Sequence, residues 1–457
     1  MFNSKALKIA YIGGGSTGWA RMFMTDLALE PELRGEVRLY DIDIEAAKRN
    51  EAIGNRITAD KMSAGKWNYA TVTTLQEALT DADFVIASIL PGTFEHMRTD
   101  VHLPERHGIY QPVGDTAGPG GIIRSLRTIP LYVLFAQAVR EFAPEAWVIN
   151  YTNPMSICMR TLYNAFPQIK ALGCCHEVFG TQELLASMLR DETGIRPGRE
   201  DIRVNVLGIN HFTWFDSAEY DGKNLLPMFA NYAERNYEKG YPGENYNKTV
   251  ECFRSTNRIK FDLYRKYGQI AAAGDRHLVE FMPGDIYLRD CETIKSWGFS
   301  LTSVDWRIKD RAERVERAKR LADGREEIAL STSGEEGITI IKALCGLTSI
   351  VTNVNLPNTA LQIKNLPKET VVETNAVFSK DSVIPVSSGQ LTGDIRNLCF
   401  PHIENQTLIL EAALSHDRYA VYAAFERDPL VNGRCTQAEI RTLADEMIER
   451  TVEEKWL

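Results

Sequence analysis

Short apolar runs alternate with amphipathic stretches over about the first 170 residues of the chain. Six of these runs predict strands, at residues 9–12, 37–40, 71–73, 84–88, 147–150 and 169–173. The stretches between most of them are long enough for helices with one apolar and one polar face. Strands and helices that alternate in this way predict an α/β fold with a parallel, doubly wound sheet of the Rossmann type.

Beyond residue 173 the alternation becomes less regular. The clearest elements there are predicted helices at residues 307–330 and 406–427 and short strands at residues 352–357 and 371–373. At 457 residues the chain is long enough for two closely joined domains with separate cores. We therefore divide it near residue 200, into a nucleotide-binding domain at 1–200 and a second α/β domain at 201–457.

The first predicted strand runs directly into a cluster of glycines. Gly13, Gly15 and Gly18 have the G-x-G-x-x-G spacing, and the next strand ends at Asp41. In this pattern the glycines let the backbone approach a pyrophosphate, and the acidic residue meets a ribose hydroxyl. We expect these residues and Ser16 to bind a dinucleotide, and NAD rather than NADP because Asp41 would repel a 2′-phosphate. The alternative is a βα turn whose glycines serve packing, with Asp41 capping the next helix.

Polar loops follow two other predicted strands, and a glycine-rich segment lies between them. Residues 91–93 and 150–154, which include Asn150 and Asn153, are expected to face the cofactor, because ligands bind beyond the carboxyl ends of parallel strands. Residues 114–121 contain four glycines and Asp115. Such a segment is typical of a mobile lid or of an exposed connection. A helix is predicted to follow from residue 130.

Charge and composition exclude several classes of protein. A net charge of −9 argues against a general nucleic-acid surface, which needs a basic stripe. No apolar run is long enough for a bilayer, and the N-terminus lacks a secretory signal, so we expect a cytoplasmic protein without a membrane partner. The eight cysteines are too sparse for a disulfide framework.

Cys175 and His211 each follow a predicted apolar strand. Cys175 opens the segment Cys175–His176–Glu177–Val178, and His211 closes a segment that begins at Gly208. A thiolate and an imidazole at neighbouring strand ends suit a borderline divalent ion in a weak, exchangeable site. The alternative is a core cysteine and a hydrogen-bonded loop histidine.

Taken together, these motifs resemble glycoside hydrolase family 4. The resemblance rests on segments 8–18, 41–43, 114–121, 152–154, 175–178, 208–211 and 428–430, and it runs over essentially the whole chain. It implies an NAD-binding domain followed by a C-terminal α/β domain like those of lactate and malate dehydrogenases. It also implies Mn²⁺ held by Cys175 and His211, and assembly into dimers or tetramers.

The resemblance implies a mechanism that departs from the usual two-carboxylate hydrolysis. NAD⁺ takes a hydride from C3 of the sugar, and the ketone acidifies the proton on C2. A base then removes that proton while Mn²⁺ stabilises the enediolate, and the leaving group departs from C1. Water adds and the ketone is reduced again, so no net oxidation occurs.

The resemblance also suggests residues for these roles. The base is expected to be Asp275 or Tyr267, with Asp115 orienting or activating it. Packing offers alternatives, because Tyr267 could belong to an apolar helix face and Asp275 could cap a turn. His176 stands where some subgroups have an acidic residue, so it either donates the proton to the leaving group or positions a hydroxyl.

Substrate recognition is expected to involve Asn153 and a cation. The C-H-E-V form of the motif, with Glu177 at its third position, is similar to the uronide-cleaving subgroup. A uronate carboxylate needs a cation, for which Arg124, Arg276 and His277 are candidates. We therefore expect a glycosidase for small α-uronides, most of all α-galacturonides from pectin. The alternatives are an α-glucuronidase, an α-glucosidase or α-galactosidase, a 2-hydroxy-acid dehydrogenase, and a non-catalytic protein that binds NAD or sugar.

Overall fold

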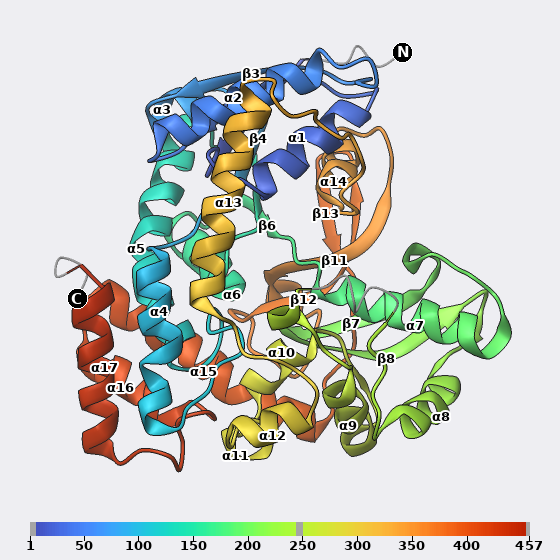
Figure 1. Ribbon diagram of the computed structural model, residues 1–457, viewed down its shortest axis with the longest axis vertical. Coiled ribbons are helices and arrows are strands. Elements are labelled where there is room, and N and C mark those ends of the chain that lie inside the picture. The colour runs from blue at the N-terminus through green and yellow to red at the C-terminus, as the bar shows by residue number, and fades with distance from the viewer. Residues whose placement is uncertain (1–5, 244–249, 454–457) are drawn as a thin grey trace.

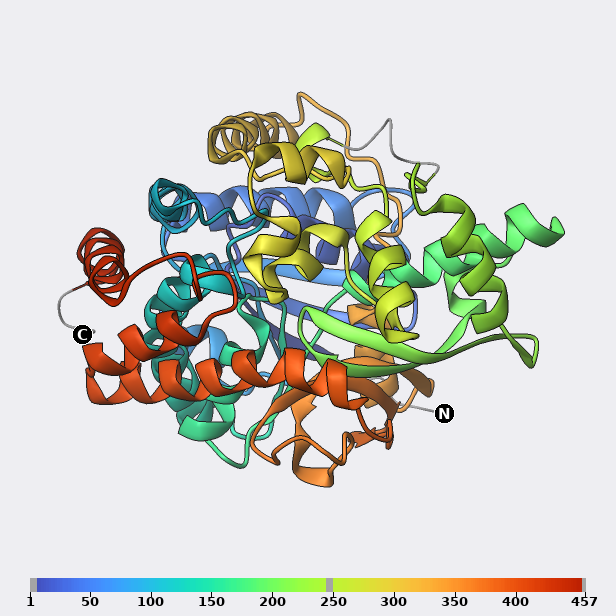
Figure 2. The same ribbon diagram turned by 90° about the horizontal axis from the view of Figure 1, so that it is seen from below.

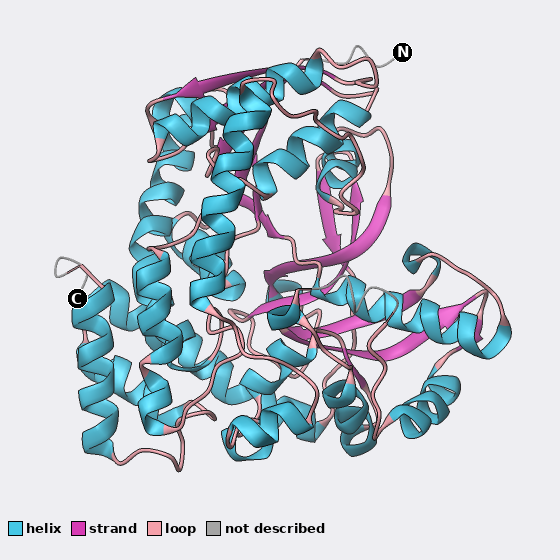
Figure 3. Ribbon diagram, viewed as in Figure 1, coloured by secondary structure: helices cyan, strands magenta, loops and turns pink. Residues whose placement is uncertain are grey.

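The computed structural model describes residues 6–243 and 250–453 (Figure 1). One large sheet passes through the molecule, with strand order β13-β12-β11-β6-β5-β4-β1-β2-β3 (Figure 3). Its strands are β1 (Leu7–Ile12), β2 (Arg34–Tyr40), β3 (Lys66–Val72), β4 (Phe84–Ala87), β5 (Trp147–Asn150), β6 (Lys170–Gly173), β11 (Ile350–Pro357), β12 (Val371–Ser379) and β13 (Ser382–Pro385).

Strands β1 to β6 form the parallel part of this sheet. Ile9 of β1 lies between Val37 of β2 and Phe84 of β4, and the same parallel pairing continues to β3 on one side and to β5 and β6 on the other. The strand order reverses between β1 and β4, and the crevice at such a switch point is where ligands bind. Each of the six predicted runs overlaps one of these strands, so the predicted Rossmann-type sheet is confirmed.

The last three strands come from the second half of the chain and are antiparallel. β11 joins the edge of β6, where Asn355 pairs with Gly173, and β12 and β13 follow outward. Two of these strands are predicted by the sequence, but their place in the first sheet is not. The second half of the chain therefore completes the sheet that the first half begins.

Helices cover both faces of the large sheet. One apolar layer joins the sheet to α1, α2, α13 and α14, and another joins it to α3, α5 and α6. These helices are α1 (Trp19–Leu29), α2 (Ile44–Thr58), α3 (Leu75–Leu79), α5 (Gly118–Phe142), α6 (Met155–Ala165), α13 (Val304–Ala322) and α14 (Gly337–Leu344). Helices on both faces leave the strand ends as the accessible edge of the parallel sheet.

A smaller antiparallel sheet lies beside strand β12 (Figures 1 and 2). It consists of β7 (Arg203–Ile209), β8 (Phe212–Tyr220), β9 (Lys223–Asn224) and β10 (Ile270–Ala271). An apolar core joins it to α7 (Glu177–Thr193), α8 (Leu226–Asn236) and α9 (Arg258–Tyr267). The two sheets are tied together where the Asn375 side chain donates to the Val204 carbonyl at 2.6 Å.

The remaining helices lie outside these layers. Two of the helices that the sequence predicts have different bounds in the structure. The helix predicted at 307–330 is α13, which ends earlier, at Ala322. The helix predicted at 406–427 is two helices, because His416 adopts a left-handed conformation with φ +59° between them. The group comprises α4 (Phe94–His102), α10 (Asp275–Leu278), α11 (Gly284–Tyr287), α12 (Cys291–Ser296), α15 (Gly393–Ser415), α16 (Arg418–Arg427) and α17 (Gln437–Thr451).

Helix α5 differs most from its prediction. It begins at Gly118 rather than near residue 130, and its first turn is buried, so much of the expected lid is a packed helix start. The glycines allow this, because a Cβ on Gly121 would lie 2.4 Å from the backbone of Thr116.

The sequence predicts no segment long and apolar enough to cross a bilayer, but α5 is both long and apolar enough. Of its most apolar stretch, 72% is buried inside the protein.

Candidate active site

The glycine turn after β1 leaves no room for side chains. A Cβ on Gly13 would lie 2.0 Å from the carbonyl oxygen of Ser88, and one on Gly15 would lie 2.9 Å from the Asp41 carboxylate. The Gly15 N–H donates to Asp41 Oδ2 at 2.8 Å. Asp41 therefore stands at the end of β2, beside the turn, in the place expected for a ribose-binding acid.

Asn50 supports this turn from α2, a role that the sequence does not reveal. Its side-chain amide donates to the carbonyl oxygens of Gly14 at 2.7 Å and Ser16 at 2.9 Å. Helix α1 begins just after Gly18. The turn is thus fixed by its neighbours, with the start of α1 directed at the space that a pyrophosphate would occupy.

Asn150 is the last residue of β5 and Asn153 lies in the loop after it, and their side chains face different ways. The Asn150 amide donates to the Thr152 carbonyl at 3.0 Å, and its oxygen accepts from the Tyr132 hydroxyl at 2.6 Å. Asn150 therefore orders the loop from inside, and its contact with a cofactor stays a prediction. Asn153 points the other way and donates to Asp115 Oδ2 at 3.4 Å.

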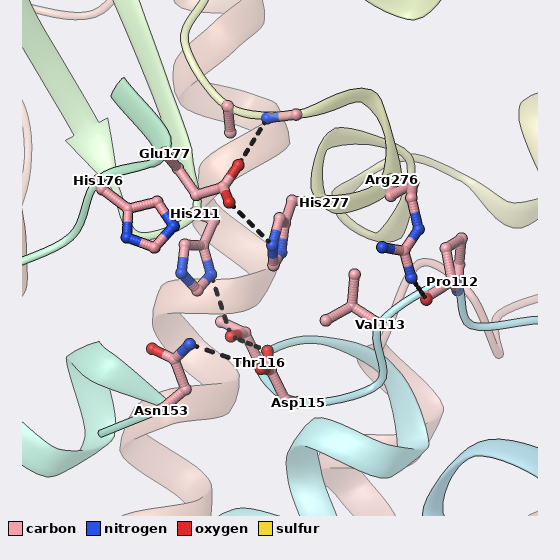
Figure 4. A network of polar contacts seen from close by, with 12 residues as sticks. Pro112, Val113, Asp115, Thr116, Asn153, His176, Glu177, His211, Arg276 and His277 are labelled. Atoms are coloured by element: carbon pink, nitrogen blue, oxygen red, sulfur yellow. Dashed lines mark hydrogen bonds and ion pairs between the residues drawn. The ribbon is translucent and has the colours of Figure 1, made fainter. Parts of the chain in front are cut away.

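Asp115, His211 and His277 converge at the centre of the site (Figure 4). Ligand atoms of these three residues all lie within 4.8 Å of one another, and the two imidazole rings are 4.3 Å apart. The three residues come from the segment before α5, the β7–β8 turn and α10. Neither the sequence spacing nor the resemblance places His277 beside His211.

Thr116 determines which nitrogen of His211 is available. Its hydroxyl donates to Asp115 Oδ1 at 2.8 Å, and it also lies 3.2 Å from Nδ1 of His211. A hydroxyl has one proton, so we infer that Nδ1–H of His211 donates to Thr116. The Nε2 lone pair of His211 is then available to a cation.

The electrostatics of the cluster also favour a cation. Burial raises the pKa of Asp115, but the positive charges of Arg124 and of the two histidines outweigh it and bring the pKa to about 2. Burial and His277 lower the pKa of His211 to about 3. Asp115 is therefore ionised and His211 neutral near pH 7, which are the forms that bind divalent ions.

Glu177 connects the C-H-E-V segment to this cluster. One of its carboxylate oxygens accepts from the Gly274 N–H at 2.8 Å, and the other lies 3.5 Å from Nε2 of His277. Burial lowers the pKa of His277, but Glu177 outweighs it, so that the pKa is raised overall. Glu177 thus favours the charged form of the His277 imidazole.

Cys175 follows β6 but is not a member of the convergent cluster. Burial raises the pKa of its thiol well above the usual value. Its carbonyl oxygen accepts from the Asn353 side chain at 3.0 Å. A metal at Cys175 would therefore have to displace a proton from the thiol. All eight cysteines are free, as the sparse spacing predicted.

The two candidate bases lie at opposite ends of α9: Asp275, the first residue of α10, is beside its start, and Tyr267 is its last residue. The buried Asp275 carboxylate lies 3.4 Å and 3.3 Å from the N–H groups of Ile259 and Lys260, which donate to it. Tyr267, at the other end of the helix, packs edge-on against Trp214 with ring centroids 5.8 Å apart. These contacts match the capping and packing alternatives, and the role of either residue as base stays a prediction.

His176 lies at the rim, half-exposed, between Trp19 and Glu335. Its ring stacks on Trp19 at 5.6 Å, and Nδ1 is 3.2 Å from the Glu335 carboxylate. The hydrogen bond with Glu335 raises the pKa of His176 to about 8. His176 is therefore protonated near neutral pH and able to donate a proton.

A cavity of about 450 Å³ opens beside His176 and Glu177. The cavity is lined by residues of α7 and α9 and by the segments at residues 253–255 and 333–335. Arg254 and Lys260 contribute positive charge to its lining. The cavity is large enough to admit a small glycoside next to the cluster.

The arginine candidates are largely occupied within the fold. Arg276 points away from the cluster and donates to the carbonyl oxygens of Pro112 and Ser300 (Figure 4). Arg124 donates to the Asn153 carbonyl at 3.1 Å and is the arginine that most lowers the pKa of Asp115. Of the two arginine candidates, Arg124 is the one tied to the site.

Two features define the class of this protein. One is a glycine turn for a dinucleotide at the switch point of the parallel sheet, and the other is the convergence of a carboxylate with two imidazoles. That class is the nucleotide-dependent enzymes that act on a small molecule held between a Rossmann-type domain and a second lobe.

The chain belongs to family 4 of the glycosyl hydrolases. The family model "Family 4 glycosyl hydrolase" matches residues 8–191, and "Family 4 glycosyl hydrolase C-terminal domain" matches residues 206–431. This confirms the resemblance seen in the sequence, and the protein is a glycoside hydrolase.

Similar proteins extend over nearly the full length of the chain. An α-galacturonidase of Lachnoclostridium phytofermentans is 56% identical over 97% of this chain and 96% of its own. One of Bacillus subtilis is 52% identical over 95% of each. A crystal structure of a glucosidase from Bacillus subtilis has 50% identity and a TM-score of 0.91 over 97% of this chain and 99% of that one.

A more distant solved structure has the same fold. It is a 6-phospho-α-glucosidase from gut microorganisms in complex with NAD and Mn²⁺, with 21% identity, a TM-score of 0.83 and coverage of 97% and 98% of the two chains.

Proposed function

We propose that this glycoside hydrolase is an α-galacturonidase that uses NAD⁺ and Mn²⁺. Relatives called α-galacturonidases are 52–56% identical to it over nearly their full length. The observation that carries the proposal is the contact of Glu177 with His277, 3.5 Å apart. The residue that sets the C-H-E-V motif apart is thereby part of the central cluster.

Both cofactors match the donor groups present. The Gly13–Gly15 turn and Asp41 would hold NAD⁺. Neither glycine has room for a side chain, so the turn presents its backbone to the pyrophosphate. Mn²⁺ would be held by Cys175 and His211, as the resemblance implies, with the ionised Asp115 within reach of the His211 nitrogen. When bound, NAD⁺ supplies reversible hydride transfer at C3 and Mn²⁺ supplies Lewis-acid stabilisation of negative charge on the sugar oxygens.

The protein's own residues would bind the sugar and move protons. His176, protonated near neutral pH, is placed at the rim to donate a proton to the leaving group. A carboxyl with a pKa of about 2 is a weak base, so Asp115 is better suited to bind a cation or a hydroxyl. Asn153, held against Asp115, is positioned to contact a sugar hydroxyl. Arg124 is the cation we assign to the neighbourhood of the substrate.

The test is hydrolysis of p-nitrophenyl α-galacturonide, α-glucuronide, α-galactoside and α-glucoside with NAD⁺, Mn²⁺ and reductant, and then with each omitted. We expect phenol release from the galacturonide that requires both cofactors, without accumulation of NADH. Preference for a glycoside that lacks the carboxylate would overturn the substrate. NADH that accumulates in proportion to substrate would overturn the redox-neutral mechanism and favour a dehydrogenase.

A further inference from the structure

The two residues that the resemblance assigns to the metal lie on different sheets. Cys175 follows β6 of the large sheet, whereas His211 is in the β7–β8 turn of the small one. A metal ion requires its ligand atoms at fixed separations, within a few tenths of an ångström. Something must therefore hold the two sheets in register at this point.

Glu373 of β12 lies between them and is 1% exposed. Its Oε2 accepts from the side-chain amide of Asn210 at 3.0 Å, and its Oε1 accepts from that of Asn353 at 2.6 Å. Asn210 and Asn353 are themselves buried. Each oxygen of one carboxylate is thus bound to a different asparagine.

The two asparagines lead to the two candidate ligands. Asn210 directly precedes His211 in the β7–β8 turn. Asn353, on β11, also donates to the carbonyl oxygen of Cys175 at 3.0 Å. A continuous path of hydrogen bonds therefore runs from the backbone of Cys175 through Asn353 and Glu373 to the residue beside His211.

We propose that Glu373 is a positioning residue that, through Asn353 and Asn210, fixes Cys175 and His211 at the separation that Mn²⁺ binding requires. This proposal rests on the metal site of the proposed function. It adds a residue from the second half of the chain, about 200 positions from Cys175, to the residues on which that site depends.

The chemistry of the carboxylate explains why Glu is needed at this position. Both oxygens of the Glu373 carboxyl group accept from N–H donors here. Glutamine has the same shape but would present its own N–H₂ to one of the two asparagines. Glu373→Gln therefore breaks one arm of the path while leaving the packing volume unchanged.

The experiment measures Mn²⁺ binding directly, from the electron paramagnetic resonance signal of free Mn²⁺ during titration of the full-length protein. We expect Glu373→Gln to weaken Mn²⁺ binding by about 10–100-fold, the usual effect of losing a residue that orients a ligand. Glu373→Asp, which keeps two acceptors on a shorter side chain, should lie between it and wild type. Raising Mn²⁺ should restore most of the glycosidase activity of both variants.

Thr374→Val is the matched control. Thr374 is the next residue of β12, is fully buried, and its hydroxyl has no hydrogen-bond partner within the described part of the chain. Its side chain points to the opposite face of the strand. We expect its Mn²⁺ affinity to stay within about twofold of wild type.

Three outcomes would overturn the proposal. They are wild-type Mn²⁺ affinity in Glu373→Gln, an equal loss in Thr374→Val, and a loss in Glu373→Gln that accompanies unfolding while Glu373→Asp, still folded, binds normally. Cys175→Ser separates this result from the proposed function. If wild type and Cys175→Ser bind Mn²⁺ equally, the assigned metal site itself is wrong.

Discussion

Glu280 is a buried carboxyl group that holds the segment before Asp115. One of its oxygens accepts from the N–H groups of Val113 at 2.6 Å and Gly114 at 2.9 Å. Burial raises the pKa of Glu280 to about 7, although both N–H donors oppose the shift. The carboxyl group therefore takes up a proton in the folded protein at a pH where the unfolded chain has already lost it.

This shift makes the stability contribution of Glu280 depend on pH. Because the folded pKa lies above the unfolded one, folding is favoured at low pH, and that contribution is lost as pH rises from about 5 to 8. Glu280→Gln keeps the oxygen that accepts both hydrogen bonds but carries no charge. We expect the stability of the variant relative to wild type to improve by on the order of 2 kcal/mol between pH 5 and pH 8.

Urea unfolding of both proteins at several pH values measures this difference. Glu280→Ala serves as the comparison, because it removes the acceptor and should be destabilised at every pH. A difference between wild type and Glu280→Gln that does not change with pH would contradict the raised pKa.

Substitutions of Asp275 and Tyr267 distinguish a role as general base from a purely structural role. Asp275 accepts two N–H groups at the start of α9 and offsets the buried charge of Lys260. We expect Asp275→Asn to lower stability by about 1–3 kcal/mol. Tyr267→Phe keeps the ring against Trp214, so it should change neither stability nor activity by much.

Melting temperature and kcat/KM, measured on the same preparations, separate the two roles. A general base contributes about 10²–10⁴-fold to the rate. A loss of that size in either variant, at an unchanged melting temperature, would identify that residue as the base.

At the scale of elements, the start of α5 determines where Asp115 lies. A Cβ on Gly121 would lie 2.4 Å from the backbone carbonyl carbon of Thr116, the residue that links Asp115 to His211. We expect Gly121→Ala to cost about 1–3 kcal/mol through overpacking and to reduce activity strongly, because Thr116 must move. Thermal unfolding and the galacturonide assay measure both effects.

Gly393→Ala is the control for this substitution. Gly393 is the first residue of α15, and apart from its chain neighbours and the backbone of its own helix, no described atom lies within 4 Å of its added Cβ. It should be neutral or slightly stabilising. Equal losses in the two variants would show that the close contact at Gly121 is not the cause.

At the scale of the whole molecule, the two halves of the chain share one sheet and its cores. Strands β11 to β13 extend the edge of β6, and α13 and α14 contribute to the apolar layer with α1 and α2. A fragment of residues 1–200 would expose that edge and that layer. We expect it to lack cooperative thermal unfolding and near-ultraviolet circular dichroism, whereas the full chain shows both. A stable, monomeric 1–200 fragment would contradict this expectation.

Assembly and location in the cell belong to the same scale. The resemblance predicts dimers or tetramers, and the sequence predicts a cytoplasmic protein. Both stay predictions, and sedimentation of the purified protein with and without Mn²⁺ and NAD⁺ tests the first.

Local patterns were enough for part of the fold and for part of the site. The runs at residues 9–12 and 37–40 became β1 and β2, because short β-branched and aromatic runs between turns favour strands wherever they pack. The Gly13–Gly15 turn and Asp41 were found because their spacing reflects local geometry. His277 was only one of three cation candidates, since nothing in its neighbourhood in the sequence indicates that its ring packs against that of His211.

The sequence by itself therefore determined the parallel sheet, the dinucleotide turn and, through its motifs, the family. Only the tertiary structure decided that β11 to β13 complete the first sheet, that α5 begins at Gly118, and that Asp115, His211 and His277 converge. The physical reason is the range of the interactions. Periodicity and turn chemistry act over a few residues, whereas sheet order, burial and the meeting of Glu373 with Asn210 depend on packing between segments far apart in the chain.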